Sequence, residues 1–174
     1  MTTGNNRSRS NAVNWTSDPR LAPVQQGRSR GHVVTSRPMP SLEKLMEDGF
    51  FFAAFLSFAT QEFSGENLEF WRDVQQFRKL GFPTVLNARV IYSKYVAAGS
   101  QHEINIRNAT RDDIKRKLGQ LQGIYESNFS DRHALAGVFD DAMVENMMTL
   151  SDTYSRFIFS DGYARCMKQL GYTV

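Results

Sequence analysis

Apolar side chains recur every three to four positions through most of the chain after residue 40, a spacing that buries one face of an α-helix. In residues 64–81 this face carries Leu68, Trp71 and Val74, which we expect to lie in a core. Residues 50–60 are so apolar that they fit a buried helix, although periodicity alone also allows a strand. The pattern predicts further helices over 41–49, 84–99, 110–121, 131–149, from about 151, and over 160–171.

Polar residues that favour helix starts precede most of these segments, and glycine or proline follows several of them. The side chains suited to capping are Ser41, Ser64 and Thr84, and Thr110 opens a stretch similar to a capping box. We find no alternating strand pattern bounded by hairpin turns, and no internal repeat. The chain is therefore predicted to be all-α, with about eight or nine short helices.

Charge divides the chain into two parts. Residues 1–40 hold six arginines and one acid, Asp18, which gives +5 and leaves −2 for the rest of a chain with net charge +3. Their Ser, Asn, Gly and Arg content predicts a disordered tail over 1–40, before a folded domain over 41–174. A basic charge confined to the tail argues against a nucleic-acid-binding face, so no nucleic acid is expected as a partner. The arginines allow a weak contact with an anionic membrane, and a solvated tail without a partner fits equally well.

Residues that catalyse reactions or bind metals are present, but not with the spacing that such sites need. The sequence has no phosphate-binding loop and no nucleophile motif, and Cys166 is expected in the core. No metal-ligand spacing with Cys or Asp involves the three histidines, His32, His102 and His133. We therefore predict a binding domain with no catalytic residue, no metal and no cofactor.

The compartment is indicated by three features of the sequence. There is a single cysteine, there is no run of about 18 apolar residues, and the first residues lack the apolar stretch of a signal peptide. We expect a cytoplasmic protein, with peripheral contact at the inner face of the plasma membrane as a further option through the tail.

Five motifs in order go beyond these general signals. They read FFFAAFLSFATQEFSGENLEFW, ARVIYSKYV, EINI followed by TRDDI, FDDAM, and DTYSRFIFSDGY. In this order and spacing they resemble the regulator of G protein signalling (RGS) domain, from roughly Ser41 to Leu170. The resemblance implies a single bundle of about nine helices that binds GTP-loaded Gα subunits and accelerates their GTP hydrolysis.

The resemblance also implies which residues contact Gα. The loop before the ENLEFW helix supplies most of them, and the EINI loop supplies Asn105, which is expected to reach toward the Gα glutamine and switch backbone. Asp152 and Arg156 form an i, i+4 pair, and their side chains are expected to hold each other in place. Ser64 is expected to cap its helix while the neighbouring glutamate and the asparagines face the partner. The full set is Glu62, Phe63, Ser64, Glu66, Asn67, Asn105, Asp152 and Arg156.

Two departures from the family pattern flank this surface. The chain is longer than usual between Arg111 and Phe139, with extra material around 119–137, and it is one residue shorter than the family pattern before Asp152. The leucine that the family often uses there therefore corresponds to one of three residues, Met148, Thr149 or Leu150. These departures leave the preferred Gα class open.

The implied mechanism needs no catalytic group from this chain. Gα supplies its own arginine in cis and a glutamine that orients the attacking water. A partner accelerates the reaction by binding the switch conformation of the transition state more tightly than that of the ground state. We therefore predict a GTPase-activating protein that recognises GTP-bound or transition-state Gα. The alternative is an RGS-homology scaffold that docks a signalling partner without GTPase activation.

Overall fold

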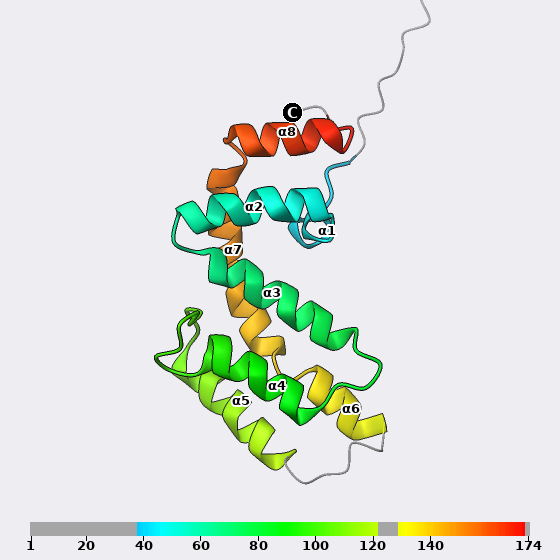
Figure 1. Ribbon diagram of the computed structural model, residues 1–174, viewed down its shortest axis with the longest axis vertical. Helices are drawn as coiled ribbons and strands as arrows, with labels where there is room; N and C mark the ends of the chain where they lie inside the picture. Colours follow the sequence, from blue (N-terminus) through cyan, green and yellow to red (C-terminus); the bar gives the residue numbers. More distant parts are fainter. Residues whose placement is uncertain (1–37, 122–128, 173–174) are drawn as a thin grey trace, which may run out of the picture. The chain divides into compact units, whose positions relative to one another are not determined.

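The computed structural model describes residues 38–121 and 129–172; residues 1–37, 122–128 and 173–174 are not described. The described residues form eight α-helices and one π-helical segment, with no strand among them (Figure 1). In chain order the elements are α1 Leu42–Met46, α2 Gly49–Gln61, α3 Gly65–Arg78, α4 Val85–Ile91, η2 Tyr92–Val96, α5 Asn108–Gln120, α6 Phe129–Ala136, α7 Asp140–Phe157 and α8 Asp161–Gln169. The predicted all-α fold is confirmed. The tail predicted over 1–40 lies almost entirely outside the described residues, so its disorder stays a prediction.

Local capping explains several helix starts. Ser41 and Ser160 each accept a hydrogen bond from the backbone N–H three residues later, at 3.4 and 3.1 Å. Thr84 and Asn87 form a complete capping box at the start of α4. Asp48 caps α2 by accepting from the N–H groups of Phe50 and Phe51 at 3.0 and 2.9 Å, a role that the sequence pattern did not indicate. With this cap, residues 50–60 are helical and the strand alternative is excluded.

The start of α5 differs from the predicted capping box. The helix begins at Asn108, and its N-cap residue, Arg107, makes no side-chain cap hydrogen bond. Thr110 is buried inside the first turn, and its hydroxyl donates to Glu145 of α7 at 2.5 Å. The capping prediction for Thr110 is wrong because α5 already begins at Asn108, which places Thr110 inside the first turn and not at the N-cap.

The prediction of one helix over 131–149 is also wrong. A turn at residues 137–139 separates α6 from α7. This turn buries Val138 and Phe139 in the core. Ser151, which was expected near the start of a new helix, lies inside α7 and donates its hydroxyl to the carbonyl four residues earlier, at 2.7 Å. The result is a continuous 18-residue α7 that passes behind α2 and α3 in Figure 1.

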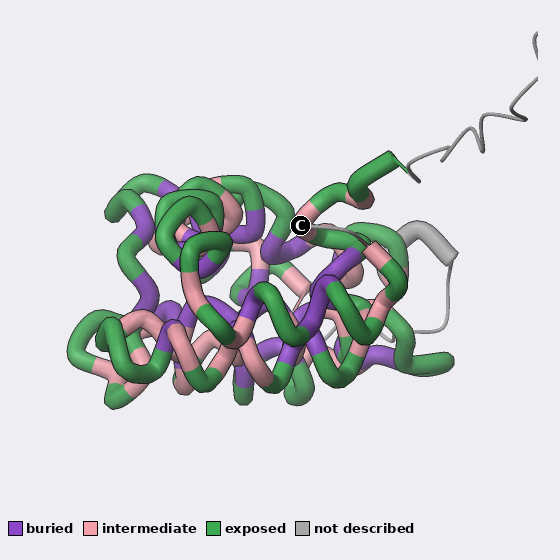
Figure 2. The backbone as a smooth tube through the Cα atoms, turned by 90° about the horizontal axis from the view of Figure 1, so that it is seen from above, coloured by how far each residue is buried: buried purple, intermediate pink, exposed green. Residues whose placement is uncertain are grey.

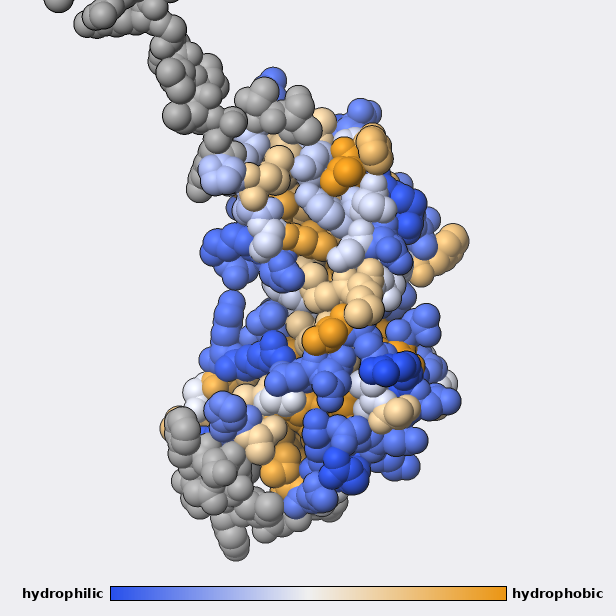
Figure 3. Space-filling view, turned by 180° about the vertical axis from the view of Figure 1, so that it is seen from behind, coloured by the Kyte–Doolittle hydropathy of each residue, from blue (hydrophilic) through white to orange (hydrophobic). Residues whose placement is uncertain are grey.

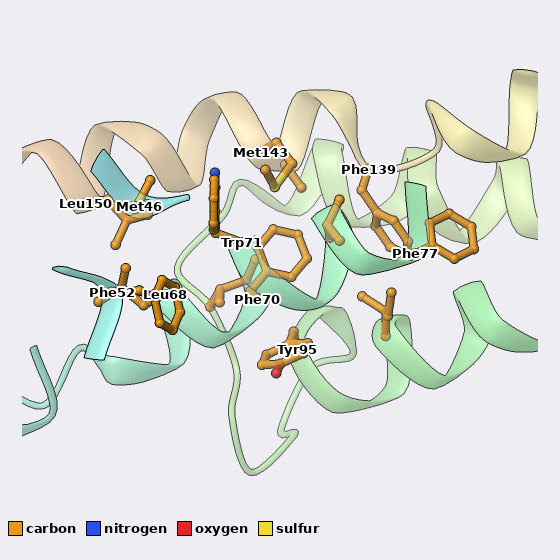
Figure 4. Packing of buried hydrophobic residues seen from close by; sticks show 14 of the residues in the cluster. Met46, Phe52, Leu68, Phe70, Trp71, Phe77, Tyr95, Phe139, Met143 and Leu150 are labelled. Carbon is orange, nitrogen blue, oxygen red and sulfur yellow. The ribbon is translucent and has the colours of Figure 1, made fainter. Parts of the chain in front are cut away.

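Aromatic side chains from several helices form the core. Phe55 of α2 stacks on Phe157 of α7 with ring centroids 4.9 Å apart. Figure 4 shows a second region, where Phe70 of α3 contacts Tyr95 and Phe139 at centroid distances of 5.5 and 6.1 Å. Buried positions lie along the inward faces of the helices, and exposed positions lie along their outer faces (Figure 2). The core thereby fixes α7 against α2 and α3.

Predicted core positions are confirmed for Leu68, Trp71, Val74 and Cys166, all of which are buried. Burial, followed by the nearby Asp48 carboxylate, raises the pKa of the Cys166 thiol. Within the described ranges, no helix is long and apolar enough to cross a membrane. The same part of the chain contains no group of three or more metal-ligating side chains.

Candidate functional site

The turn between α2 and α3 presents an aromatic ring to solvent. Phe63 is 94% exposed and has a φ of 54°, the left-handed conformation in which helices usually place glycine. Its N–H donates to the Thr60 carbonyl at 3.2 Å, and the Ser64 N–H donates to the Ala59 carbonyl at 2.8 Å, as in a Schellman motif. This conformation costs an L-residue about 1–2 kcal/mol. An exposed phenylalanine in a strained conformation makes this turn a candidate contact surface.

The first turn of α3 packs closely against the end of α2. A Cβ atom on Gly65 would lie 2.7 Å from the Thr60 hydroxyl oxygen, so a larger residue requires that side chain to move. The Ser64 hydroxyl donates to the Ala59 carbonyl at 3.2 Å and lies 3.5 Å from the hydroxyl of Thr153 in α7. The prediction that Ser64 caps α3 is wrong, because Ser64 stands at the N-cap position with ψ of 18°, and its side chain accepts no hydrogen bond from the first turn. Ser64 instead connects the turn to α2 and α7.

Asn67 is only 3% exposed, which contradicts the expectation that its side chain faces a partner in the free chain. Its Nδ2 donates to the Ser64 carbonyl at 3.3 Å and to Glu66 Oε1 at 3.0 Å. Its backbone carbonyl accepts a hydrogen bond from Asn146 Nδ2 of α7 at 3.0 Å. Asn67 Oδ1 has no hydrogen-bond partner among the described residues. Asn67 therefore organises the first turn of α3, while the partly exposed Glu66 is the member of the pair nearer the surface.

Asn105 projects from the loop between η2 and α5. Its side chain is exposed, whereas Ile104 and Ile106 on either side are buried. The Ile106 N–H donates to the Ile104 carbonyl at 3.1 Å, which makes Asn105 the central residue of a γ-turn. The Ile104 N–H in turn donates to the Tyr95 carbonyl at 2.9 Å. Two buried neighbours and these bonds fix the backbone from which the Asn105 side chain leaves the fold.

The end of α7 is joined to the α2–α3 turn by an ion pair. Arg156 Nε and Nη2 each lie 2.7 Å from Glu62 Oε2, while its Nη1 donates to the backbone carbonyl of Asp152 at 3.0 Å. The predicted pairing of the Asp152 and Arg156 side chains is wrong, because the Glu62 carboxylate takes the guanidinium. The hydrogen bond to Glu62 raises the pKa of Arg156. Both side chains remain accessible to solvent, so the pair orients the turn more than it stabilises the fold.

These contacts attach two loops to α7, and four of the eight predicted residues lie in them. Glu62, Phe63 and Ser64 lie in the turn that Arg156 holds, and Asn105 lies in the other loop. Both loops lie on the left of the view in Figure 1, toward the N-terminal end of α3.

The three residues considered for the family's leucine have different surroundings. Leu150 is buried in the core. Met148 is 67% exposed and lines a groove of about 590 Å³ between α3 and α7. Figure 3 shows the molecule from behind, the side on which α7 lies, and apolar side chains form a band there between hydrophilic regions. Thr149 precedes Thr153 and Arg156 by four and seven positions, so it shares the α7 face that meets the α2–α3 turn.

Sequence reasoning missed two α7 residues that hold these loops. Glu145 accepts hydrogen bonds from Arg107 and Thr110, and Asn146 donates to the backbone of Asn67. Neither residue belongs to a motif used in the sequence analysis. The one local signal is the amide of Asn146 in the middle of a helix, a position where asparagine is a poor helix former.

The extra material around 119–137 is described only in part. Its first residues complete α5 and its last residues form α6, whereas residues 122–128 lie outside the described ranges. Neither part contributes a predicted contact residue.

Comparisons with known proteins point to one family. A family model described as Regulator of G protein signaling domain matches residues 41–166. Regulator of G-protein signaling 8 from Danio rerio is 30% identical over 149 residues, covering 82% of this chain and 79% of that protein. Regulator of G-protein signaling 5 from Mus musculus is 36% identical over 80 residues, covering 45% and 44%. Regulator of G-protein signaling loco from Drosophila melanogaster is 27% identical over 146 residues, covering 82% and 9%.

The chain thus spans less than half the length of the mouse and fly relatives. The family match itself extends from the residue that caps α1 into α8 and includes both loops described above. The chain therefore belongs to the regulator of G protein signalling family.

Proposed function

We propose that this chain is a GTPase-activating protein for Gα subunits, which shortens signalling by accelerating GTP hydrolysis. One observation carries the proposal: Asn105 is exposed on a backbone segment that two buried neighbours hold in place. A backbone that is ordered before binding loses little conformational entropy when its side chain contacts a partner. The Asn105 side chain is therefore suited to ordering another protein's switch segment.

The proposed mechanism is selective stabilisation of the transition state. Gα provides the arginine and the water-orienting glutamine, so this chain supplies neither a base nor a nucleophile. A hundredfold acceleration requires about 2.7 kcal/mol of binding energy that appears only in the transition state. Two or three hydrogen bonds at about 0.5–1.5 kcal/mol each are of this size. We assign the largest share to Asn105.

The remaining predicted residues form the second part of the proposed contact. The exposed Phe63 ring supplies apolar area, while Glu66 and Asp152 supply charged groups at its edge. The pairing between Glu62 and Arg156 holds the turn in place before Gα binds. Asn67 acts in this scheme through the shape of the first turn of α3.

A second candidate function is a scaffold that docks a signalling partner without activating a GTPase. The burial of Asn67 favours it, because one of the amides that the family resemblance assigns to the Gα contact is not presented to a partner. The exposed and ordered Asn105 favours GTPase activation. We therefore keep activation as the proposal.

Single-turnover GTP hydrolysis by a panel of Gα proteins, with and without the full chain, tests the proposal. We expect acceleration of at least one Gα, together with tighter binding to its GDP–aluminium fluoride form than to its GDP form. Binding to a Gα without any acceleration would support the scaffold instead. The absence of both binding and acceleration across the panel would overturn the proposal.

A further inference from the structure

A single carboxylate attaches the Asn105 loop to α7. Glu145 Oε2 accepts a hydrogen bond from the backbone N–H of Arg107, two residues after Asn105, at 2.8 Å. Glu145 Oε1 accepts from Arg107 Nε at 2.9 Å and lies 2.8 Å from its Nη2. The same oxygen accepts from the Thr110 hydroxyl at 2.5 Å. Glu145 thus binds the backbone of the loop, the side chain at its end and the first turn of α5.

The Glu145 carboxylate is well shielded from solvent, unlike most ion pairs of this domain. Its side chain is 14% exposed, whereas that of Arg107 is 76% exposed. Burial alone would raise the pKa of Glu145, but hydrogen bonds from Arg107 and Thr110 outweigh it and lower the pKa to about 2. The group is therefore charged at neutral pH. Removing it leaves the Arg107 backbone N–H without its acceptor, which loosens the loop next to Asn105.

The next residue of α7 holds the first turn of α3, which directly follows the other loop. Asn146 Nδ2 donates to the carbonyl of Asn67 at 3.0 Å, in the first turn of α3. Consecutive residues of an α-helix point about 100° apart, so Glu145 and Asn146 reach elements on two sides of α7. This rigid helix therefore sets the separation between the Asn105 loop and the α2–α3 turn.

We infer that Glu145 is a positioning residue for Asn105, through its bonds to Arg107 and Thr110. The inference rests on the proposed GTPase activation, in which Asn105 contacts the Gα switch segment. Glu145 does not touch Gα in this scheme. It fixes the end of the γ-turn so that the Asn105 amide is already oriented when the transition state forms.

A double-mutant cycle tests whether Glu145 acts through Asn105. Glu145→Gln keeps the side-chain shape but removes the charge and replaces one acceptor oxygen with an N–H₂ group. In single-turnover hydrolysis at saturating chain, Glu145→Gln and Asn105→Ala should each lower the stimulated rate about tenfold. The double variant should also lose about tenfold, because Glu145 has no effect once the amide is absent. A loss of about a hundredfold would show that Glu145 acts independently of Asn105, and would overturn the inference.

Asp113→Asn is the matched control, since it removes a carboxylate of α5 that also pairs with cations, Arg116 and Lys117, but does not bond to the Asn105 loop. It should leave the stimulated rate unchanged. Amide hydrogen exchange of the free chain is measured alongside. The Arg107 amide should exchange at least tenfold faster in Glu145→Gln and at the original rate in Asp113→Asn. Unchanged exchange in Glu145→Gln would overturn the inference, whatever the rates with Gα.

The two measurements also separate this inference from the proposed function. If the unmodified chain accelerates no Gα, the proposed function fails, while the exchange of the Arg107 amide still decides whether Glu145 orders the loop. If the chain accelerates hydrolysis and Asn105→Ala has no effect, Asn105 is not the group being positioned, and the inference fails with the proposed function intact.

Discussion

The backbone conformation at Phe63 favours glycine, whereas the proposed Gα contact uses the exposed phenylalanine ring. Glycine adopts the left-handed conformation freely, so Phe63→Gly removes a cost of about 1–2 kcal/mol. Greater freedom of the unfolded chain returns about 0.5–1 kcal/mol of that gain. We expect the melting temperature to stay the same or rise slightly. Affinity for Gα with GDP and aluminium fluoride should fall, because the exposed ring is lost. A variant with a lower melting temperature and normal affinity would contradict this assignment.

The two asparagines should respond differently to truncation. Asn105→Ala removes an exposed amide and should change the melting temperature little, while lowering the stimulated rate about tenfold, equivalent to about 1.4 kcal/mol. Asn67→Ala removes two buried hydrogen bonds and should destabilise the fold by about 1–3 kcal/mol. Thermal unfolding and single-turnover hydrolysis of both variants test this contrast. Equal melting temperatures would show that Asn67 does not organise the start of α3.

The asparagines also show how far sequence reasoning reaches at this scale. The EINI motif alternates apolar and polar residues, and this alternation is consistent with an outward-facing Asn105 between buried isoleucines. The burial of Asn67 depends on how closely α3 packs against α7, and Asn146 lies 79 positions away in sequence. A local sequence pattern cannot predict a contact between residues so far apart in the chain.

At the scale of elements, capping predictions succeeded where the predicted residue stands at the N-cap with an extended backbone. Ser41 and Thr84 cap their helices as predicted, with ψ of 160° and 157°. Ser64 stands at the N-cap of α3 with ψ of 18° and makes no side-chain cap, and Thr110 lies inside α5, which begins at Asn108. The local sequence shows which side chains could cap a helix, whereas the packed structure decides which of these hydrogen bonds form. Packing is also why the break at 137–139 escaped prediction, since the turn there buries two apolar residues.

The attachment of the α5 start to α7 should depend on pH through Glu145. Its pKa is lowered to about 2 from a usual value of 4.5, so its contribution to stability is fully present above about pH 4.5. That contribution is lost as the pH falls from about 4.5 toward 2. Thermal unfolding of the unmodified chain and Glu145→Gln should therefore differ most near neutral pH and converge below pH 3. A difference that widens on acidification would contradict the assigned direction.

At the scale of the whole molecule, composition and periodicity were enough to predict the class of fold. The apolar faces that predicted the helices are the faces now buried, including Leu68, Trp71 and Val74. The site was predicted less completely. Motif order pointed to the two loops, whereas the way in which α7 connects them through Glu145 and Asn146 appears only when the helices are packed.

The basic charge of the chain is separable from its folded domain, and this leads to a prediction for the whole protein. Residues 1–37 contain six arginines and Asp18, a charge of +5, which leaves −2 on the remainder. Each basic residue near an anionic membrane contributes about 1 kcal/mol of attraction, an effect that salt screens. Deleting residues 1–37 should therefore weaken binding to phosphatidylserine vesicles, most strongly at low salt. The rate of GTP hydrolysis by Gα in solution should stay within about twofold of the rate with the unmodified chain, because the predicted contact residues all lie after the deletion.

A full-length control with all six arginines changed to glutamine keeps the length of the tail and removes its positive charge. It should bind vesicles as weakly as the deletion does, and it should stimulate Gα in solution as the unmodified chain does. Vesicle binding that survives both changes would place the membrane contact on the folded domain, despite its negative charge. A solution rate that falls in the deletion but not in the glutamine variant would show that the tail takes part in the Gα contact through something other than its charge.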